Sequence, residues 1–251
     1  MPEGGPPSPP EEWTDAGRVE EEGKGASGGT RERPADDPHR RPAKLPAEVN
    51  EELVASVGAA TAERDAKRLQ DATRAYERER YPDARRLLER LARRAPEVAA
   101  VRELHGLTLY RMGKWRAAIT ELEAAQRLSG SIEQHPVLAD CHRALRHYDE
   151  VDRLWDELRR DGAPAPVVVE GRIVAAGALA DRGKVTEAIR LLEQGPVEVR
   201  NPREHHLRLW YALAALHERG GDLPRARELF RRVVDADSGF ADAAERHRSL
   251  R

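Results

Sequence analysis

The sequence has a single cysteine, few aromatic residues and no long apolar segment. Aromatic residues make up 4% of its 251 residues and Cys141 is the only cysteine, so no internal disulfide forms and a disulfide-stabilised secreted scaffold is excluded. The longest uncharged apolar stretch is residues 173–180, whereas a transmembrane helix needs ~20 residues. The first residues combine acid and proline, unlike a signal peptide. We therefore expect a cytoplasmic protein without a membrane anchor.

The chain also lacks an excess of charge of either sign. Charged residues make up 35% of it, but 43 Lys and Arg face 45 Asp and Glu, which gives a net charge of -2. This balance provides no overall field that would attract nucleic acid or an anionic membrane. Arginine outnumbers lysine 38 to 5, a bias that we take as the mark of a GC-rich genome.

Residues 1–46 lack the apolar residues that a folded core requires. They contain nine of the 17 prolines and seven of the 19 glycines, and ten acidic residues against seven basic ones. Such a segment buries too little apolar surface to offset its ordering entropy. We expect a disordered, charged tail that is rich in proline and glycine. Trp13, which lies between acidic residues, leaves open a role as a recruitment or regulatory arm.

Residues 47–64 are expected to form a short amphipathic helix and a lead-in. Pro46 is tolerated at a helix start, and Gly58 is a plausible stop. Apolar side chains between them fall on one helical face; they are Val49, Leu53, Val54 and Val57. This helix either packs on the folded body or captures another molecule.

One pattern recurs five times in residues 65–238. Each unit has a marker position, with a small residue twelve positions before it and a large apolar residue four positions after it. The markers are Ala84, Ala118, Val151, Ala188 and Ala226. Five positions before each marker we expect an interhelical turn, where glycine readily takes the left-handed conformation; the occupants are Glu79, Gly113, Arg146, Gly183 and Gly221.

The flanking segments have helical periodicity, and no segment alternates convincingly enough for a strand. The small residues would let paired helices approach closely, and stacking of units would provide the stability that one unit lacks. We therefore expect an all-α, right-handed α-solenoid of about five stacked helix–turn–helix units. Residues 239–251 are expected to form a C-terminal capping helix, in which Phe240 and either Ala243 or Ala244 cover the last unit.

The pattern resembles the tetratricopeptide repeat (TPR) family. The second unit is the best match, with Gly106, Tyr110, Gly113, Trp115, Ala118 and Leu122. The third departs most, because Arg146 replaces the turn glycine and Val151 replaces alanine. The chain looks most like actinobacterial TPR-containing proteins. The resemblance implies a non-enzymatic scaffold or adaptor, a monomer that binds a protein or peptide in its concave groove.

Few residue patterns indicate catalysis or metal binding. Cys141 lies six residues from both His135 and His147, with His142 beside it, but this spacing lacks the close Cys/His pairs of zinc sites. The stretch 177–185 has five residues between its glycines and a valine after the lysine, so it does not fit a phosphate loop. We expect no enzyme, no metal and no cofactor.

First helices line the concave side in the resembled family, which places a candidate binding groove on these helices. The position eight before each marker holds Tyr76, Tyr110 and Arg143 in the first three units, and Tyr211 lies further along. Aromatic residues and arginine are enriched in binding hot spots. We expect these four residues to hold an internal peptide or helix, unless the tyrosines only cover neighbouring helices.

A second candidate surface is a stripe of arginines in the first unit. Steps of four place Arg86, Arg90 and Arg94 on one helical face, with Arg85 and Arg93 beside it. The stripe is either a solvated face or a docking site for an acidic partner or the acidic tail. The alternative function is a nucleic-acid-associated repeat factor, although no aromatic residues are interleaved for base stacking.

Overall fold

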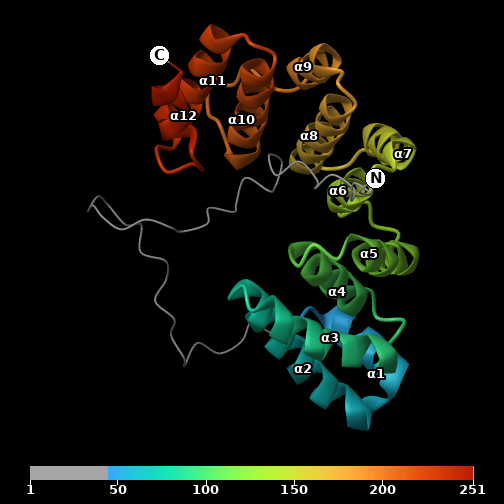
Figure 1. The fold of residues 1–251 in the computed structure, drawn as a ribbon. Helices are drawn as coiled ribbons and strands as arrows, with labels where there is room; N and C mark the ends of the chain where they lie inside the picture. The colour runs from blue at the N-terminus through green and yellow to red at the C-terminus, as the bar shows by residue number, and fades with distance from the viewer. Residues whose placement is uncertain (1–44, 251) are drawn as a thin grey trace, which may run out of the picture. The chain divides into compact units, whose positions relative to one another are not determined.

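The computed structural model describes residues 45–250, which form twelve helices without a strand (Figure 1). The predicted tail lies outside the described residues except for Leu45 and Pro46. The described residues form two bodies, 45–131 and 132–250. The helices of the first body are α1 (Ala47–Val57), α2 (Ala59–Glu77), α3 (Tyr81–Arg94), α4 (Ala99–Arg111) and α5 (Trp115–Ser129). Those of the second are α6 (His135–Ala144), α7 (Tyr148–Arg160), α8 (Ala165–Asp181), α9 (Val185–Glu193), α10 (Glu204–Arg219), α11 (Leu223–Ala236) and α12 (Ala243–Ser249).

Ten of these helices pair into five helical hairpins, from α2–α3 to α10–α11. The same turn closes every hairpin, and its central residue has a φ between 58° and 85° at Glu79, Gly113, Arg146, Gly183 and Gly221. The N–H of the next residue donates to the carbonyl five residues earlier over 2.8–2.9 Å in all five turns. These bonds satisfy carbonyls that a helix end leaves free. The predicted turn positions and the all-α repeat fold are confirmed.

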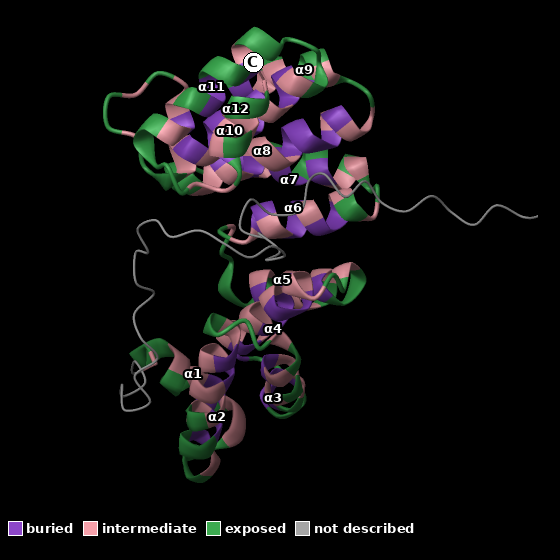
Figure 2. Cartoon of the chain, turned by 60° about the vertical axis from the view of Figure 1, so that its left-hand side comes forward, coloured by how far each residue is buried: buried purple, intermediate pink, exposed green. Residues whose placement is uncertain are grey.

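The repeated small and large residues form the cores of the hairpins. All five markers are fully buried. The small residues twelve positions before them are buried as well. The large residues four positions after the markers are buried as well; they are Leu88, Leu122, Trp155, Leu192 and Phe230. Figure 2 shows that most helices carry both buried and exposed residues, as expected where each helix packs on its neighbours along one side.

Helix α1 packs on the first body, and its bounds agree with the predicted helix. Leu53 is fully buried, and Val49 and Val57 pack against the same core. The Glu52 carboxylate accepts a hydrogen bond of 3.1 Å from the backbone N–H of Ala99, and this bond joins α1 to the start of α4. Val54, the fourth apolar residue of this helix, is 46% exposed and does not join that core.

The two ends of the repeat region differ from the expected boundaries. Helix α2 begins at Ala59, so the lead-in expected before residue 65 is already part of the first hairpin. At the other end, α12 begins only at Ala243, because a turn precedes it in which Ala241 has a φ of 44°. Phe240 packs against the core and Ala243 is fully buried, so residues near this end do cover the last hairpin. Of the helices in residues 45–250, none is long and apolar enough to cross a membrane.

Candidate functional site

The two predicted groove tyrosines of the first body occupy equivalent places in neighbouring hairpins. The ring of Tyr76 contacts Tyr81 edge to face at a centroid distance of 5.6 Å. Tyr110 contacts Trp115 in the same way at 5.5 Å. In both hairpins the partner ring is the first residue of the second helix. Each tyrosine is half-buried, so packing holds its position while part of the residue stays accessible.

A cation links these two aromatic pairs. The guanidinium of Arg111, the residue next to Tyr110, lies over the ring of Tyr81 at 5.1 Å from its centroid. Tyr81 is in turn the ring partner of Tyr76. The structure therefore brings the predicted residues Tyr76 and Tyr110 onto adjacent hairpins that are joined by one cation–π contact. We call Tyr76, Tyr81, Tyr110, Arg111 and Trp115 the aromatic row.

The other two predicted groove residues, Arg143 and Tyr211, belong to the second body. The guanidinium of Arg143 pairs with Asp140 at 3.0 Å and with Asp181 at 2.7 Å, and its side chain is 10% exposed. The guanidinium also lies against Gly177, where a Cβ would be 3.0 Å from its central carbon. An acidic ligand at Arg143 would therefore compete with two carboxylates of the protein itself.

Tyr211 is held by residues at the C-terminal end of the second body. Its hydroxyl donates to Asp242 over 2.6 Å and accepts from Arg246 over 3.1 Å. Burial and the hydrogen bond to Asp242 raise the pKa of Tyr211 to about 12. Arg246 also pairs with Glu218, the residue of the last hairpin at the register of Tyr76 and Tyr110. Side chains of this body thus already occupy that part of the last hairpin.

Four of the five arginines of α3 are exposed and Arg85 is partly buried, and their charges are only partly paired. Arg86 pairs with Asp83, Arg93 with Glu89, and Arg94 with the buried Asp65. Arg90 is exposed. We call Arg85, Arg86, Arg90, Arg93 and Arg94 the α3 arginine face.

In the histidine and cysteine cluster, His135, Cys141 and His142 are buried, whereas His147 is exposed. Cys141 is fully buried, and burial raises the pKa of its thiol well above the ordinary value. Burial lowers the pKa of His135, against the opposing effect of Glu157. The His142 and His147 rings are 5.7 Å apart. Within residues 45–250, no group of three or more His, Cys, Asp or Glu side chains is arranged to hold a metal ion.

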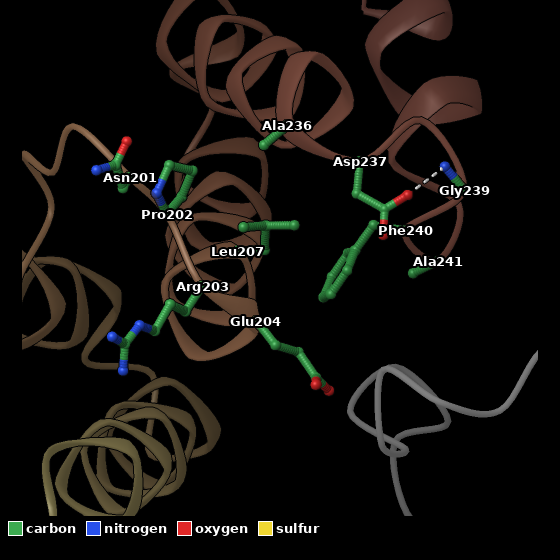
Figure 3. A pocket seen from close by; sticks show the side chains of 10 residues that line it. All are labelled: Asn201, Pro202, Arg203, Glu204, Leu207, Ala236, Asp237, Gly239, Phe240 and Ala241. Atoms are coloured by element: carbon green, nitrogen blue, oxygen red, sulfur yellow. Dashed lines mark hydrogen bonds between the residues drawn. The ribbon is translucent and has the colours of Figure 1, made fainter.

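The structure shows one further feature that the sequence pattern did not indicate. An open pocket of about 690 Å³ lies where α10 begins and α11 ends (Figure 3). Leu207 and Phe240 face each other across it, and Glu204 lies at its edge. The pocket combines the start of α10 and the end of α11 with the loops before and after them, so its two segments lie about thirty residues apart in the sequence and share no motif.

Comparison with protein families identifies the repeats. A profile of the tetratricopeptide repeat matches residues 69–131 and 178–239. These ranges cover most of the first two and the last two hairpins, and they leave out the third, where Arg146 and Val151 depart from the pattern. The chain is a tetratricopeptide repeat protein. Such repeats generally mediate protein–protein interaction.

Two solved structures have a similar fold. A thermophilic TPR protein of Thermus thermophilus is 18% identical, with a TM-score of 0.58 over 74% of this chain and 98% of the other. A Podospora anserina protein described as a kinesin light chain with nearly identical TPR-like repeats is also 18% identical, with a TM-score of 0.54 over 70% of this chain and 95% of the other. A search of curated protein sequences found no match. The resemblance to actinobacterial proteins stays a prediction.

Proposed function

We propose that this TPR protein is a non-enzymatic scaffold or adaptor that binds a peptide or helix of another protein on the first helices of its hairpins. The observation that supports this proposal most is the aromatic row. Tyr76 and Tyr110 occupy the same register in adjacent hairpins, and both are half-buried against a second ring. Two equivalent anchors, one per repeat, fit an elongated ligand that runs across the hairpins.

The packing of the aromatic row favours binding energetically. A ring that is already held in place loses little conformational entropy when a ligand contacts it. Aromatic side chains also supply much of the binding energy at protein interfaces. Arg143 and Tyr211 are proposed separately, as weaker contacts for a ligand of the second body, because both already have partners there.

The environments of Cys141 and Tyr211 assign neither side chain a nucleophilic role in this proposal. A catalytic cysteine or tyrosine works best when its pKa is lowered, because the deprotonated form is the nucleophile or base. In this protein, burial raises the pKa of both Cys141 and Tyr211. Both groups therefore stay protonated near neutral pH, and the proposal assigns them to packing and hydrogen bonding.

An affinity experiment tests the proposal. The full chain is immobilised and exposed to a lysate of its native source, and the retained proteins are identified. The same lysate is then passed over the Tyr76→Ala, Tyr110→Ala double variant and over Tyr148→Ala. Tyr148 is a suitable control because it is a half-buried tyrosine that contacts Arg182 and lies on the second helix of another hairpin.

The expected result is that the double variant loses the partner while Tyr148→Ala keeps it. Circular dichroism and thermal melts confirm that each variant is folded. If truncation to alanine disrupts the first body, leucine at both positions keeps the apolar packing and removes only the rings. Undiminished retention by a folded double variant would refute the assignment of the aromatic row.

A further inference from the structure

Helix α3 carries the largest surplus of positive charge among the helices of residues 45–250. It has five arginines against Asp83 and Glu89, and Arg80 immediately before it adds a sixth. The outward arginines are well exposed; the side chain of Arg86, for example, is 70% accessible. The surplus is therefore presented to solvent.

The first body does not supply enough carboxylates to neutralise this surface. Asp83 is shared between Arg80 and Arg86. Asp65 is shared between Arg68 and Arg94. Among residues 45–250, neither Arg85 nor Arg90 pairs with a carboxylate, and the Nε of Arg85 is buried without a hydrogen bond. Uncompensated arginines at close spacing repel one another, so an acidic segment bound here would relieve that repulsion.

The same chain contains an acidic segment of matching size. Residues 11–22 hold six acidic residues and only one basic residue, Arg18. They also contain Trp13 and Val19, the only large apolar residues of that segment. An arginine guanidinium stacks favourably on a tryptophan ring, so Trp13 adds a contact that pure charge attraction lacks.

The connection between this segment and the first body is long enough for contact within one chain. Residues 23–44 lie between the acidic segment and Leu45, and a chain of that length can span up to about 70 Å. A body the size of residues 45–131 has a radius of gyration of about 12 Å. The acidic segment can therefore reach any surface of this body, at an effective concentration on the order of millimolar.

We propose that residues 11–22 dock on the α3 arginine face of the same chain. Carboxylates of the segment pair with Arg86 and Arg90, and Trp13 lies against a guanidinium of that face. The contact masks the helix with the largest positive charge within residues 45–250. It keeps nucleic acid and other polyanions from this surface. The aromatic row consists of other residues and stays available to a protein ligand.

A spin label in the full chain tests this contact. Ala16→Cys places one reactive thiol within the acidic segment. Cys141 does not compete for the label, because it is fully buried and burial raises the pKa of its thiol. Amide signals of the ¹⁵N-labelled protein are compared between the oxidised and the reduced nitroxide. We expect Arg86, Leu87 and Arg90 to lose more than half of their signal intensity at low salt. The signals should recover at about 0.5 M salt, where the Debye length falls to roughly 4 Å.

Two charge-reversed variants separate this surface from general electrostatics. Arg86→Glu with Arg90→Glu should abolish the broadening of α3 signals. Arg116→Glu with Arg127→Glu makes the same charge change at exposed residues of α5 and should leave the broadening intact. If the α3 variant does not fold, the triple variant Glu20→Gln, Glu21→Gln, Glu22→Gln provides the test without touching the helix, and it should reduce the broadening.

Three results would overturn the proposal. The first is an α3 unaffected by the label at low salt. The second is equal broadening with and without the α3 arginines, which indicates nonspecific contact. The third is a single-stranded oligonucleotide that shifts α3 signals while the label leaves them unchanged, which assigns the surface to nucleic acid. None of these results depends on whether the aromatic row binds a protein.

Discussion

Leu122 packs directly on the backbone of Gly106. A Cβ at Gly106 would lie 2.6 Å from the Leu122 Cγ and 3.1 Å from the Leu122 backbone nitrogen. Both residues belong to the repeated pattern, since Gly106 is the small residue twelve positions before the marker and Leu122 is the large residue four positions after it. The contact sets how closely α4 and α5 approach.

Gly106→Ala should therefore destabilise the protein, although alanine in place of glycine normally stabilises a helix by about 1 kcal/mol. Overpacking of a close contact costs roughly 1–3 kcal/mol, which exceeds the gain in propensity. Gly177→Ala provides a comparison, because the new methyl there meets the end of the Arg143 side chain at 3.0 Å, a milder contact than the 2.6 Å at Gly106. Urea unfolding should rank Gly106→Ala as clearly less stable than Gly177→Ala, and the reverse order would contradict the packing described.

The turn residues of the first and third hairpins should be open to stabilisation. Glu79 has a φ of 58° and Arg146 a φ of 60°, and a side chain in this left-handed region costs roughly 1–2 kcal/mol. Glycine avoids most of that cost, so Glu79→Gly and Arg146→Gly should each raise the free energy of unfolding by up to about 1 kcal/mol. Gly113→Ala should have the opposite effect. If the denaturation midpoint falls in both glycine variants, the Glu79 and Arg146 side chains contribute more stability than their left-handed conformation costs.

The hydroxyl of Tyr211 should stabilise the C-terminal end of the second body. Tyr211→Phe keeps the ring contact with Phe230 and removes the hydrogen bonds to Asp242 and Arg246. A hydrogen bond to a charged group contributes about 1.5–3 kcal/mol. A double-mutant cycle with Asp242→Asn measures the coupling between the two residues. A coupling energy near zero would mean that this contact contributes nothing to stability.

Stability should fall below neutral pH through His135. Burial holds the pKa of His135 below the ordinary value, and the charge of Arg153 lowers it further. Glu157 and Asp161 act in the opposite direction and raise it. The unfolded chain takes up a proton near pH 6.5, whereas the folded chain resists it, so the stabilisation is complete above that pH and is lost as the pH falls through it. One such group gives a slope of at most about 1.4 kcal/mol per pH unit. His135→Leu should flatten the dependence of unfolding free energy on pH between 5 and 7; an unchanged slope would assign it to other groups.

The repeat architecture follows from the sequence because each unit repeats one packing solution. The alanines at 84, 118, 188 and 226 are fully buried, as the marker pattern requires. Even Glu79 and Arg146 take the left-handed turn conformation, although neither residue favours it, because both hairpins must close in the same geometry. A register shared by five units therefore predicts backbone conformation at positions where the local residue does not.

The site was only partly predictable, because side-chain partners depend on tertiary contacts. The sequence places Tyr76 and Tyr110 in one register, but the contact of Arg111 with Tyr81 joins residues thirty positions apart. The sequence likewise did not indicate that Asp181 of one hairpin would pair with Arg143 of the preceding hairpin. The pocket between Leu207 and Phe240 has no repeat signature, since it is built from the ends of α10 and α11 and the adjoining loops.

The most direct test of the central claim is the affinity of the retained partner for defined variants. Isothermal titration compares the wild-type chain with Tyr76→Ala, Tyr110→Ala and with Tyr148→Ala at about 0.1 M and 0.5 M salt. Loss of hot-spot rings should weaken binding by about thirtyfold or more, while Tyr148→Ala and added salt have little effect. Binding that is unaffected by the two tyrosines but collapses with salt, and with Arg86→Glu, Arg90→Glu, would contradict the account and assign recognition to the α3 arginine face.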